Sequence, residues 1–171
     1  MAKQVNNNIK ILFVCHGNIC RSTMAEFVMK ELVRQAGRAE EFCIASAATS
    51  REEIGNDTHS GTKEQLEKHG IPFTRRHAVQ IKRSDYDQYD LILVFDQENI
   101  REVRRICGPD AEHKVYSLAD FAHLGRDIAD PWYTGDFVRT YDDVSACCQA
   151  LLAQLERTKG DVLTKTLQGK A

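Results

Sequence analysis

The stretch ILFVCHGNICRST (residues 11–23) places two thiols, a guanidinium and two hydroxyl groups close together in the chain. An apolar run ends at Cys15, and Arg21 follows six positions later. Gly17 and Asn18 lie between them, and these residue types adopt positive φ most readily, so the chain can curl tightly. A curled loop that leads into a helix turns backbone N–H groups inward and forms a site for an anion. The stretch therefore predicts an anion-binding loop with a thiol inside it.

Several features of this loop favour the thiolate form of Cys15. Inward N–H dipoles, the helix N-terminus and the Arg21 guanidinium all bring positive charge to the sulfur, and the Ser22 hydroxyl can donate a hydrogen bond to it. The planar Arg21 fork also matches two phosphate oxygens at once. Thr23 and Glu26 fit a capping box that would fix the start of the helix. Such a loop is suited to binding a tetrahedral dianion and attacking it with sulfur.

Each of these residues has a simpler interpretation when it is taken alone. A cysteine that ends a strand usually serves packing, and Ser22 or Thr23 would cap a helix. Cys15, His16 and Cys20 suggest a metal, but no fourth ligand follows at a suitable spacing. A G-x-x-x-x-G-K nucleotide loop is absent. The combination of Cys-x5-Arg-Ser with glycine and asparagine between strand and helix favours the chemical interpretation, with no metal and no cofactor.

Alternating strand and helix patterns are expected to position this loop. Apolar runs predict strands over residues 9–15, 41–48, 89–96 and 113–118. Helical periodicity or stop signals predict helices after the loop and over residues 58–69, 99–107 and 137–155. The alternation indicates an α/β fold, a doubly wound parallel sheet with helices on both faces. Ligands of such folds bind beyond the carboxyl ends of the strands, which is where Cys15 lies. We expect one domain over residues 1–171, with a core at about 8–157 and a polar tail at 158–171.

The composition limits which classes of partner and which cellular compartment are expected. The 171 residues include 23 basic and 25 acidic side chains, a net charge of −2. A nucleic-acid-binding protein would carry a basic excess, and the apolar runs are too short to span a membrane, so neither partner is expected. The first residues do not form a secretory signal. We therefore expect the six cysteines to be thiols in the reducing cytoplasm.

The segment VCHGNICRS resembles the signature loop of the low-molecular-weight protein tyrosine phosphatases. Further matches extend the resemblance over nearly the whole chain to about residue 157: SAATS (46–50), IGN (54–56), KHGI (68–71), YDLILVFD (89–96) and DPW (130–132). The resemblance implies a flavodoxin-like four-stranded parallel sheet of order 2-1-3-4. It also implies hydrolysis of phosphotyrosine in proteins or peptides, and of small aryl phosphates, with inorganic phosphate as product.

The resemblance assigns roles within IADPWYTGD (residues 128–136) and the anion-binding loop. Asp130 precedes a proline, which holds it extended, and it matches the general acid of the family. The implied mechanism forms a phosphocysteine on Cys15, which water hydrolyses with Asp130 acting as base, while Arg21 stabilises the phosphoryl oxygens. Ser22, Asn18 and Ser46 are expected to support the nucleophile and the loop. The expected phosphate-binding loop is His16, Gly17, Asn18, Ile19, Cys20 and Arg21.

The expected pocket walls are Ile19, Glu52, Trp132 and Tyr133. Ile19, Trp132 and Tyr133 can sandwich an aromatic ring, and the resemblance implies that isoleucine at position 19 favours phosphotyrosine over phosphoarginine. Glu52 stands where the family usually has an aromatic residue, and a carboxylate there would repel acidic phosphopeptides.

A second departure from the family pattern affects the support of the loop. The family has a histidine near A-R-Q-I, whereas this chain reads RRHAVQI (residues 75–81). Either Arg76 or His77 could therefore join the support network of Asn18 and Ser46. Proximity in sequence also suggests a reversible Cys15–Cys20 disulfide that would shield the nucleophile from overoxidation.

Two other classes of function are compatible with this scaffold. An arsenate reductase-like thiol oxidoreductase would need relay cysteines, for which the downstream candidates Cys107, Cys147 and Cys148 lie on predicted helices. Such an enzyme would also leave Asp130 without a purpose. A non-catalytic phosphoprotein-binding module would be expected to lack Cys15 or Asp130, and both are present. The sequence therefore favours the phosphatase.

Overall fold

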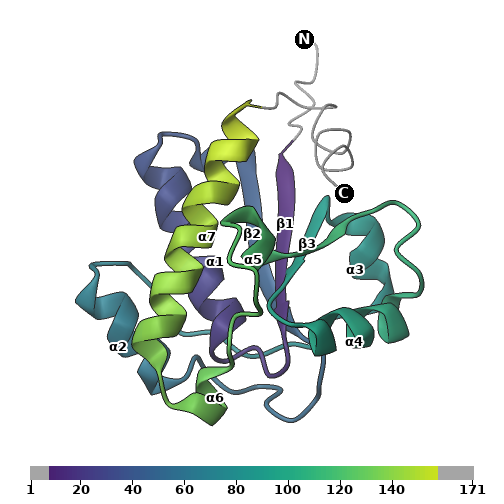
Figure 1. The fold of residues 1–171 in the computed structure, drawn as a ribbon, viewed down its shortest axis with the longest axis horizontal. Helices are drawn as coiled ribbons and strands as arrows, with labels where there is room; N and C mark the ends of the chain where they lie inside the picture. The colour runs from purple at the N-terminus through teal and green to yellow at the C-terminus, as the bar shows by residue number, and fades with distance from the viewer. Residues whose placement is uncertain (1–7, 158–171) are drawn as a thin grey trace.

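The computed structural model of the protein describes residues 8–157, which form a parallel four-stranded sheet between helices (Figure 1). The strands are β1 (Ile9–Cys15), β2 (Phe42–Ala48), β3 (Leu91–Val94) and β4 (Val115–Ser117). Their order is β2-β1-β3-β4, and every neighbouring pair is parallel. The doubly wound α/β fold with strand order 2-1-3-4 is therefore confirmed. The predicted polar tail, residues 158–171, lies outside the described residues.

The helices follow the strands in the predicted alternation. They are α1 (Arg21–Gln35), the 3-10 turn η1 (Ala39–Glu41), α2 (Ser60–Lys68), α3 (Arg83–Gln88), α4 (Gln97–Cys107), α5 (Leu118–Phe121), α6 (Pro131–Thr134) and α7 (Phe137–Arg157). The start of α4 lies two residues before the predicted one, because the Asp96 side chain accepts a hydrogen bond from the Asn99 N–H (2.8 Å) and caps the helix. The short helices α3, α5 and α6 were not predicted, since four to six residues are too few to show a helical period.

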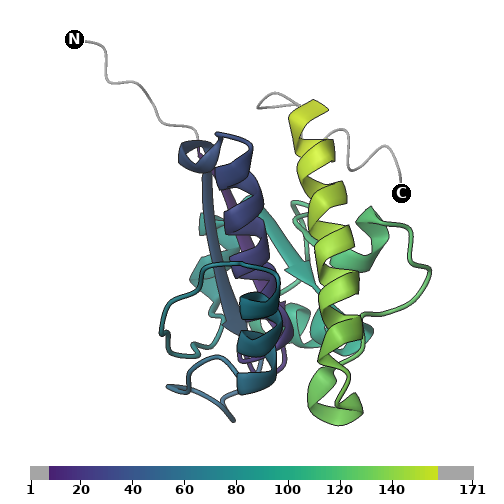
Figure 2. The same ribbon diagram turned by 90° about the vertical axis from the view of Figure 1, so that its left-hand side faces the viewer.

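Each face of the sheet has its own core. Alternate residues of β1 point to opposite faces, so Ile11, Phe13 and Cys15 join the cluster that contains α1, α5 and α7. Leu12 and Val14 join the cluster on the side of α3 and α4. Figures 1 and 2 show α1 and α7 side by side on one face, with α3 and α4 on the other. The Cys15 side chain thus faces α1, the helix that follows it in the chain.

The carboxyl ends of the strands bring separate segments to one end of the sheet. Cys15 pairs in register with Ala48 at the end of β2, and Ala48 bridges to Gln80. The Thr49 N–H donates to the Cys15 carbonyl (2.8 Å), and the Ala48 N–H donates to the Val79 carbonyl (2.7 Å). The loop that follows β1 and helix α6 lie at this same end (Figure 1). A ligand site assembled here can draw side chains from every part of the chain.

Helix α7 packs mainly against α1 and α5. Its buried residues recur at three or four positions, as the sequence pattern predicts: Tyr141, Val144, Cys147, Cys148, Leu151, Leu152 and Leu155. Within residues 8–157, no helix combines the length and the apolar content that crossing a membrane requires.

Candidate active site

Cys15 lies at the base of a pocket, at the junction of β1 and the loop that leads to α1. Its side chain is buried. The Asn18 backbone N–H donates to its sulfur at 3.4 Å, and the Ser22 Oγ lies 3.0 Å from the same sulfur. Ser22 belongs to the first turn of α1, where backbone N–H groups point along the helix axis toward the loop. Every polar neighbour of the sulfur can therefore donate a hydrogen bond to a thiolate.

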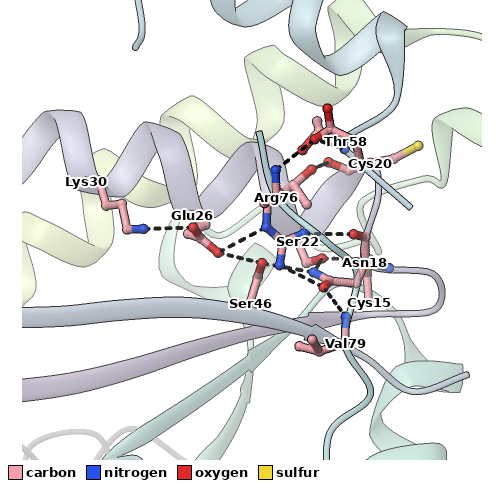
Figure 3. Close-up of polar contacts among 12 residues, drawn as sticks. Cys15, Asn18, Cys20, Ser22, Glu26, Lys30, Ser46, Thr58, Arg76 and Val79 are labelled. Atoms are coloured by element: carbon pink, nitrogen blue, oxygen red, sulfur yellow. Dashed lines mark hydrogen bonds and ion pairs between the residues drawn. The ribbon is translucent and has the colours of Figure 1, made fainter. Parts of the chain in front are cut away.

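Asn18 holds the loop in its curled conformation. Its φ is 58°, in the left-handed region that asparagine tolerates better than most residues, while Gly17 does not adopt positive φ. The Asn18 side-chain amide donates to the Ser22 Oγ (2.8 Å) and to the Ser46 Oγ (2.9 Å). Its amide oxygen accepts from the Val79 N–H (3.2 Å). This fully buried amide thus ties α1, β2 and the segment before α3 to the loop (Figure 3).

Glu26 extends the network below the loop. The Ser46 hydroxyl donates to the Glu26 carboxylate at 2.6 Å, and Lys30 pairs with the same carboxylate at 2.8 Å (Figure 3). The predicted capping box of Thr23 and Glu26 is therefore wrong. Helix α1 begins at Arg21 without a side-chain cap, which places Thr23 inside the helix, where its hydroxyl donates to the Cys20 carbonyl (3.0 Å).

Arg76, and not His77, joins the support network. Its guanidinium donates from Nη1 to the Asn18 carbonyl (3.0 Å) and from Nη2 to the Asn18 Oδ1 (2.9 Å) (Figure 3). Its Nε lies 4.0 Å from the Glu26 carboxylate. The His77 ring instead contacts the Gly55 carbonyl (2.9 Å) at the surface. Arg76 therefore occupies the position that the departure from the family pattern left open.

Arg21 is almost completely buried (1% exposed). Its Nη1 contacts Asp96 at 2.7 Å and donates to the Ile128 carbonyl at 2.9 Å, while Nη2 lies 3.3 Å from the Asp130 carboxylate. Burial lowers the pKa of Arg21, but the negative groups around it outweigh burial and raise the pKa, so the guanidinium stays charged. Its Nε has no hydrogen-bond partner among residues 8–157. A buried donor without a partner is rare in proteins.

Asp130 and the pocket walls lie opposite the nucleophile loop. Asp130 has extended backbone angles (φ −78°, ψ 114°) before Pro131, and its carboxylate accepts from the Trp132 N–H (3.0 Å). Trp132 and Tyr133 are 56% and 79% exposed. The structure brings Cys15, Asp130 and all four expected walls to one pocket, which is lined by Cys15, His16, Gly17, Ile19, Cys20, Glu52, Glu53, Asp130, Trp132 and Tyr133. Asn18 and Arg21, which were also expected in the phosphate-binding loop, are not among the lining residues.

The charged rim of the pocket comes from the loop after β2. The Glu52 carboxylate lies 3.0 Å from the His16 ring at the surface. Glu53, which the sequence did not single out, lines the pocket beside Glu52, and its Cγ would lie 3.4 Å from a Cβ at Gly17. Two carboxylates thus stand on one side of the opening, with Trp132 and Tyr133 also at the pocket.

The cysteines form neither disulfides nor a metal site within residues 8–157. All six cysteines are free thiols, and none of the groups of His, Cys, Asp and Glu within residues 8–157 is arranged to hold a metal ion. Burial, followed by the nearby Cys15, raises the pKa of the Cys20 thiol. The Cys15–Cys20 disulfide stays a prediction.

Comparison with known proteins identifies the family. A sequence model of the family described as "Low molecular weight phosphotyrosine protein phosphatase" matches residues 10–161. The low molecular weight protein-tyrosine-phosphatase YfkJ of Bacillus subtilis is 36% identical over 153 residues, which are 88% of this chain and 98% of that protein. PtpA of Staphylococcus aureus is 32% identical over 145 residues, 84% of this chain and 92% of that protein. The chain belongs to this family. It is a low-molecular-weight protein-tyrosine-phosphatase.

Solved structures of this phosphatase family share the fold. The crystal structure of YfkJ has a TM-score of 0.85 and covers 90% of this chain and 98% of its own. The phosphatase of Streptococcus pyogenes (36% identical, TM-score 0.77) covers 90% and 95%. Vibrio vulnificus Wzb, solved in complex with benzylphosphonate, is 29% identical with a TM-score of 0.73 and covers 84% and 97%.

Besides Glu53, the sequence did not single out Asp96, which contacts Arg21 of this phosphatase. Asp96 follows β3 and binds both Arg21 and the N-terminus of α4. Its position in the sequence could have identified it, because an acidic residue directly after a buried strand lies at the ligand-binding edge of a parallel sheet.

The relay cysteines that an arsenate reductase-like enzyme would need on this phosphatase scaffold do not lie at the pocket of Cys15. Cys107, Cys147 and Cys148 are buried on α4 and α7, and none of them lines the pocket of Cys15. This arrangement gives no support to a cysteine relay.

Proposed function

We propose that this phosphatase hydrolyses phosphotyrosine in proteins and peptides, and small aryl phosphates, through a phosphocysteine on Cys15. The observation that carries the proposal is the position of the Cys15 sulfur. It receives the Asn18 N–H and touches the Ser22 hydroxyl, and it shares a pocket with the carboxylate of Asp130. A nucleophile surrounded by donors and facing a potential acid is the arrangement that phosphoryl transfer to sulfur requires.

In the first step the Cys15 thiolate attacks phosphorus while the bond to the leaving oxygen breaks. A phosphate ester leaves poorly as a free alkoxide or phenoxide, so Asp130 donates a proton to that oxygen. The leaving group departs as a neutral alcohol or phenol, and the phosphoryl group stays bonded to sulfur. Asp130 carries out this role from the loop over the pocket, where Pro131 keeps its backbone extended.

In the second step a water molecule attacks phosphorus and the bond to sulfur breaks. Asp130, now ionised, accepts the proton from the water, and inorganic phosphate forms as Cys15 returns to the thiolate. The loop N–H groups and Arg21 stabilise the charge on the phosphoryl oxygens in both steps. The unpartnered Nε of Arg21 supports this role.

The Arg21 guanidinium also contacts the proposed acid. Its contact with Asp130 is the longest of its three polar contacts (3.3 Å), whereas Asp96 and the Ile128 carbonyl hold Nη1 at 2.7 and 2.9 Å. A phosphate dianion attracts the guanidinium more strongly than one carboxylate does. Substrate binding therefore weakens the contact between Arg21 and Asp130.

Aryl phosphates fit the walls of the pocket. Ile19, Trp132 and Tyr133 present apolar surface around the opening, and an aromatic ring packs well against such groups. Wzb, a relative of similar fold, has been solved with benzylphosphonate, which supports an aryl ligand for this chain. Glu52 and Glu53 add negative charge at the rim, so substrates without acidic neighbours are preferred. We also place the enzyme in the cytoplasm, where six free thiols persist.

The proposal is tested by hydrolysis of p-nitrophenyl phosphate and of matched phosphotyrosine, phosphoserine and phosphoarginine peptides. We expect the wild type to favour phosphotyrosine. Cys15→Ser should lose essentially all turnover, whereas Cys43→Ser, at an exposed cysteine on β2, should retain it. Unchanged turnover in Cys15→Ser, or a preference for phosphoserine or phosphoarginine, would contradict the proposal.

A further inference from the structure

We propose that His59 is a positioning residue that fixes the spacing between the apolar walls of the substrate pocket and thereby selects aryl ligands. The inference rests on the proposed function, because it concerns the same pocket. His59 lies outside the pocket lining and at the N-terminus of α2. It nevertheless contacts both wall elements, the Ile19 segment through its backbone and Trp132 through its ring.

The backbone and ring of His59 are held by hydrogen bonds. Its N–H donates to the Ile19 carbonyl (2.8 Å), which ties it to the phosphate-binding loop. Its Nδ1 accepts from the Gly61 N–H (2.9 Å), so the ring caps α2. These two bonds fix both the position of the residue and the orientation of its imidazole relative to the loop.

The imidazole face packs on the first residue of α7. The His59 and Phe137 rings are stacked, with centroids 4.9 Å apart and an interplanar angle of 18°. The Phe137 ring is itself confined by α2, because a Cβ at Gly61 would lie only 2.7 Å from it. Real Cβ atoms do not approach so closely, so glycine at position 61 allows this close contact of the two helices. Phe137 therefore leaves the imidazole little freedom to tilt.

The edge of this fixed ring meets the indole of Trp132. The centroids are 5.8 Å apart and the planes are nearly perpendicular (85°), a favourable aromatic geometry. Among residues 8–157, His59 provides the one aromatic ring in contact with the indole of Trp132. Trp132 is half-exposed on a four-residue helix, so few other contacts restrain it. The position of this wall relative to Ile19 is thus set through His59.

The variant His59→Asn separates the ring contact with Trp132 from the capping of α2. Asparagine is also a strong N-cap, so α2 should persist while the contact with Trp132 is lost. The matched control is His69→Asn at the other end of α2, where the ring is likewise stacked, on Tyr141 at 3.8 Å, but remote from the pocket. Trp132 is the only tryptophan of the chain, so its fluorescence reports the contact directly.

The test measures calorimetric affinities for benzylphosphonate and inorganic phosphate, together with the fluorescence of Trp132. In His59→Asn we expect benzylphosphonate to bind about three- to tenfold more weakly, the range that one aromatic pair supports. Phosphate, which needs only the loop, should keep its affinity within about twofold. The emission should change in His59→Asn and not in His69→Asn, and neither affinity should change in His69→Asn.

Two results would overturn the proposal. Unchanged benzylphosphonate affinity in His59→Asn would show that the contact between His59 and Trp132 does not determine aryl binding. This conclusion would hold even if the fluorescence of Trp132 changed. An equal loss of phosphate affinity would show that His59 acts on the loop rather than on the wall. Because both ligands are non-hydrolysable, these readings do not depend on turnover. Failure of the proposed function would be read separately, from wild-type hydrolysis of p-nitrophenyl phosphate.

Discussion

The two loops that form the pocket differ in how firmly the protein holds them. In the loop that we propose binds phosphate (the phosphate-binding loop, residues 16–21), Asn18 is fully buried and bonded to Ser22, Ser46, Arg76 and Val79. In the loop of the proposed acid (the acid loop, residues 128–136), Trp132 and Tyr133 are more than half exposed. Asp130 there has a 3.3 Å contact with Arg21 and caps the four-residue helix α6.

This difference separates two tasks of one enzyme. The phosphoryl group is the same in every substrate, so a loop that binds it gains from a single fixed geometry. Leaving groups vary, and they meet a more exposed wall, whose indole is held by the ring of His59 rather than by the phosphate site. Substitutions in the phosphate-binding loop should therefore slow the hydrolysis of all substrates alike. Substitutions in the acid loop should slow hydrolysis to a degree that depends on the leaving group.

The largest effect is expected for Asp130→Asn, which keeps a cap acceptor for α6 but cannot donate the proton. Hydrolysis of phenyl phosphate, with its poor leaving group, should slow by about a hundredfold to ten-thousandfold. For p-nitrophenyl phosphate, kcat/KM should fall by less than about tenfold, because it reports formation of the phosphocysteine and the nitrophenolate leaves without much protonation. Steady-state kinetics on a series of substituted phenyl phosphates measures how the rate depends on the leaving group.

The control for Asp130→Asn is Asp136→Asn, on the same loop but outside the pocket lining, where the carboxylate accepts from the Arg139 N–H. It should leave the dependence on the leaving group unchanged. An equal loss for all phenyl phosphates in Asp130→Asn would remove the distinction between the two loops.

An intermediate effect is expected for Arg76→Leu. The change removes two donors from Asn18, and a buried acceptor left unpaired costs about 1–3 kcal/mol of stability. The loop loses part of its fixed geometry, so kcat/KM should fall about tenfold, equally for phenyl and p-nitrophenyl phosphate. Urea denaturation and kinetics on both substrates test this. His77→Leu serves as the neighbouring control, and a comparable loss there would refute the role of Arg76.

The smallest effect is expected for Glu52→Gln at the rim. Removing this charge should lower KM about two- to threefold for phosphotyrosine peptides with acidic neighbours, and the gain should vanish at high salt. Peptides with neutral neighbours should change less. Glu112→Gln, where the carboxylate pairs with Lys114 outside the pocket lining, is the control. A gain that persists at high salt would show that the charge of Glu52 is not its cause.

The sheet and the position of Cys15 between a strand and a helix could be predicted from the sequence, because both depend on local patterns. Apolar runs define the buried strands, and Cys-x5-Arg between a strand and a helix identifies the loop. The support network was harder to predict, because its members come from α1, β2 and the segment before α3. Glu26 illustrates this difficulty. Its spacing from Thr23 fits a capping box, yet the helix begins at Arg21 and the carboxylate binds Ser46 instead. His59 likewise gains its contacts only when α2, α6 and α7 come together.

The most direct test of the mechanism is rapid quenching of a single turnover with radiolabelled aryl phosphate, followed by peptide mapping of the protein. Attack by sulfur predicts label on the peptide that contains Cys15, appearing before inorganic phosphate is released. Label on any other residue, or phosphate release with no labelled protein at any time, would contradict it.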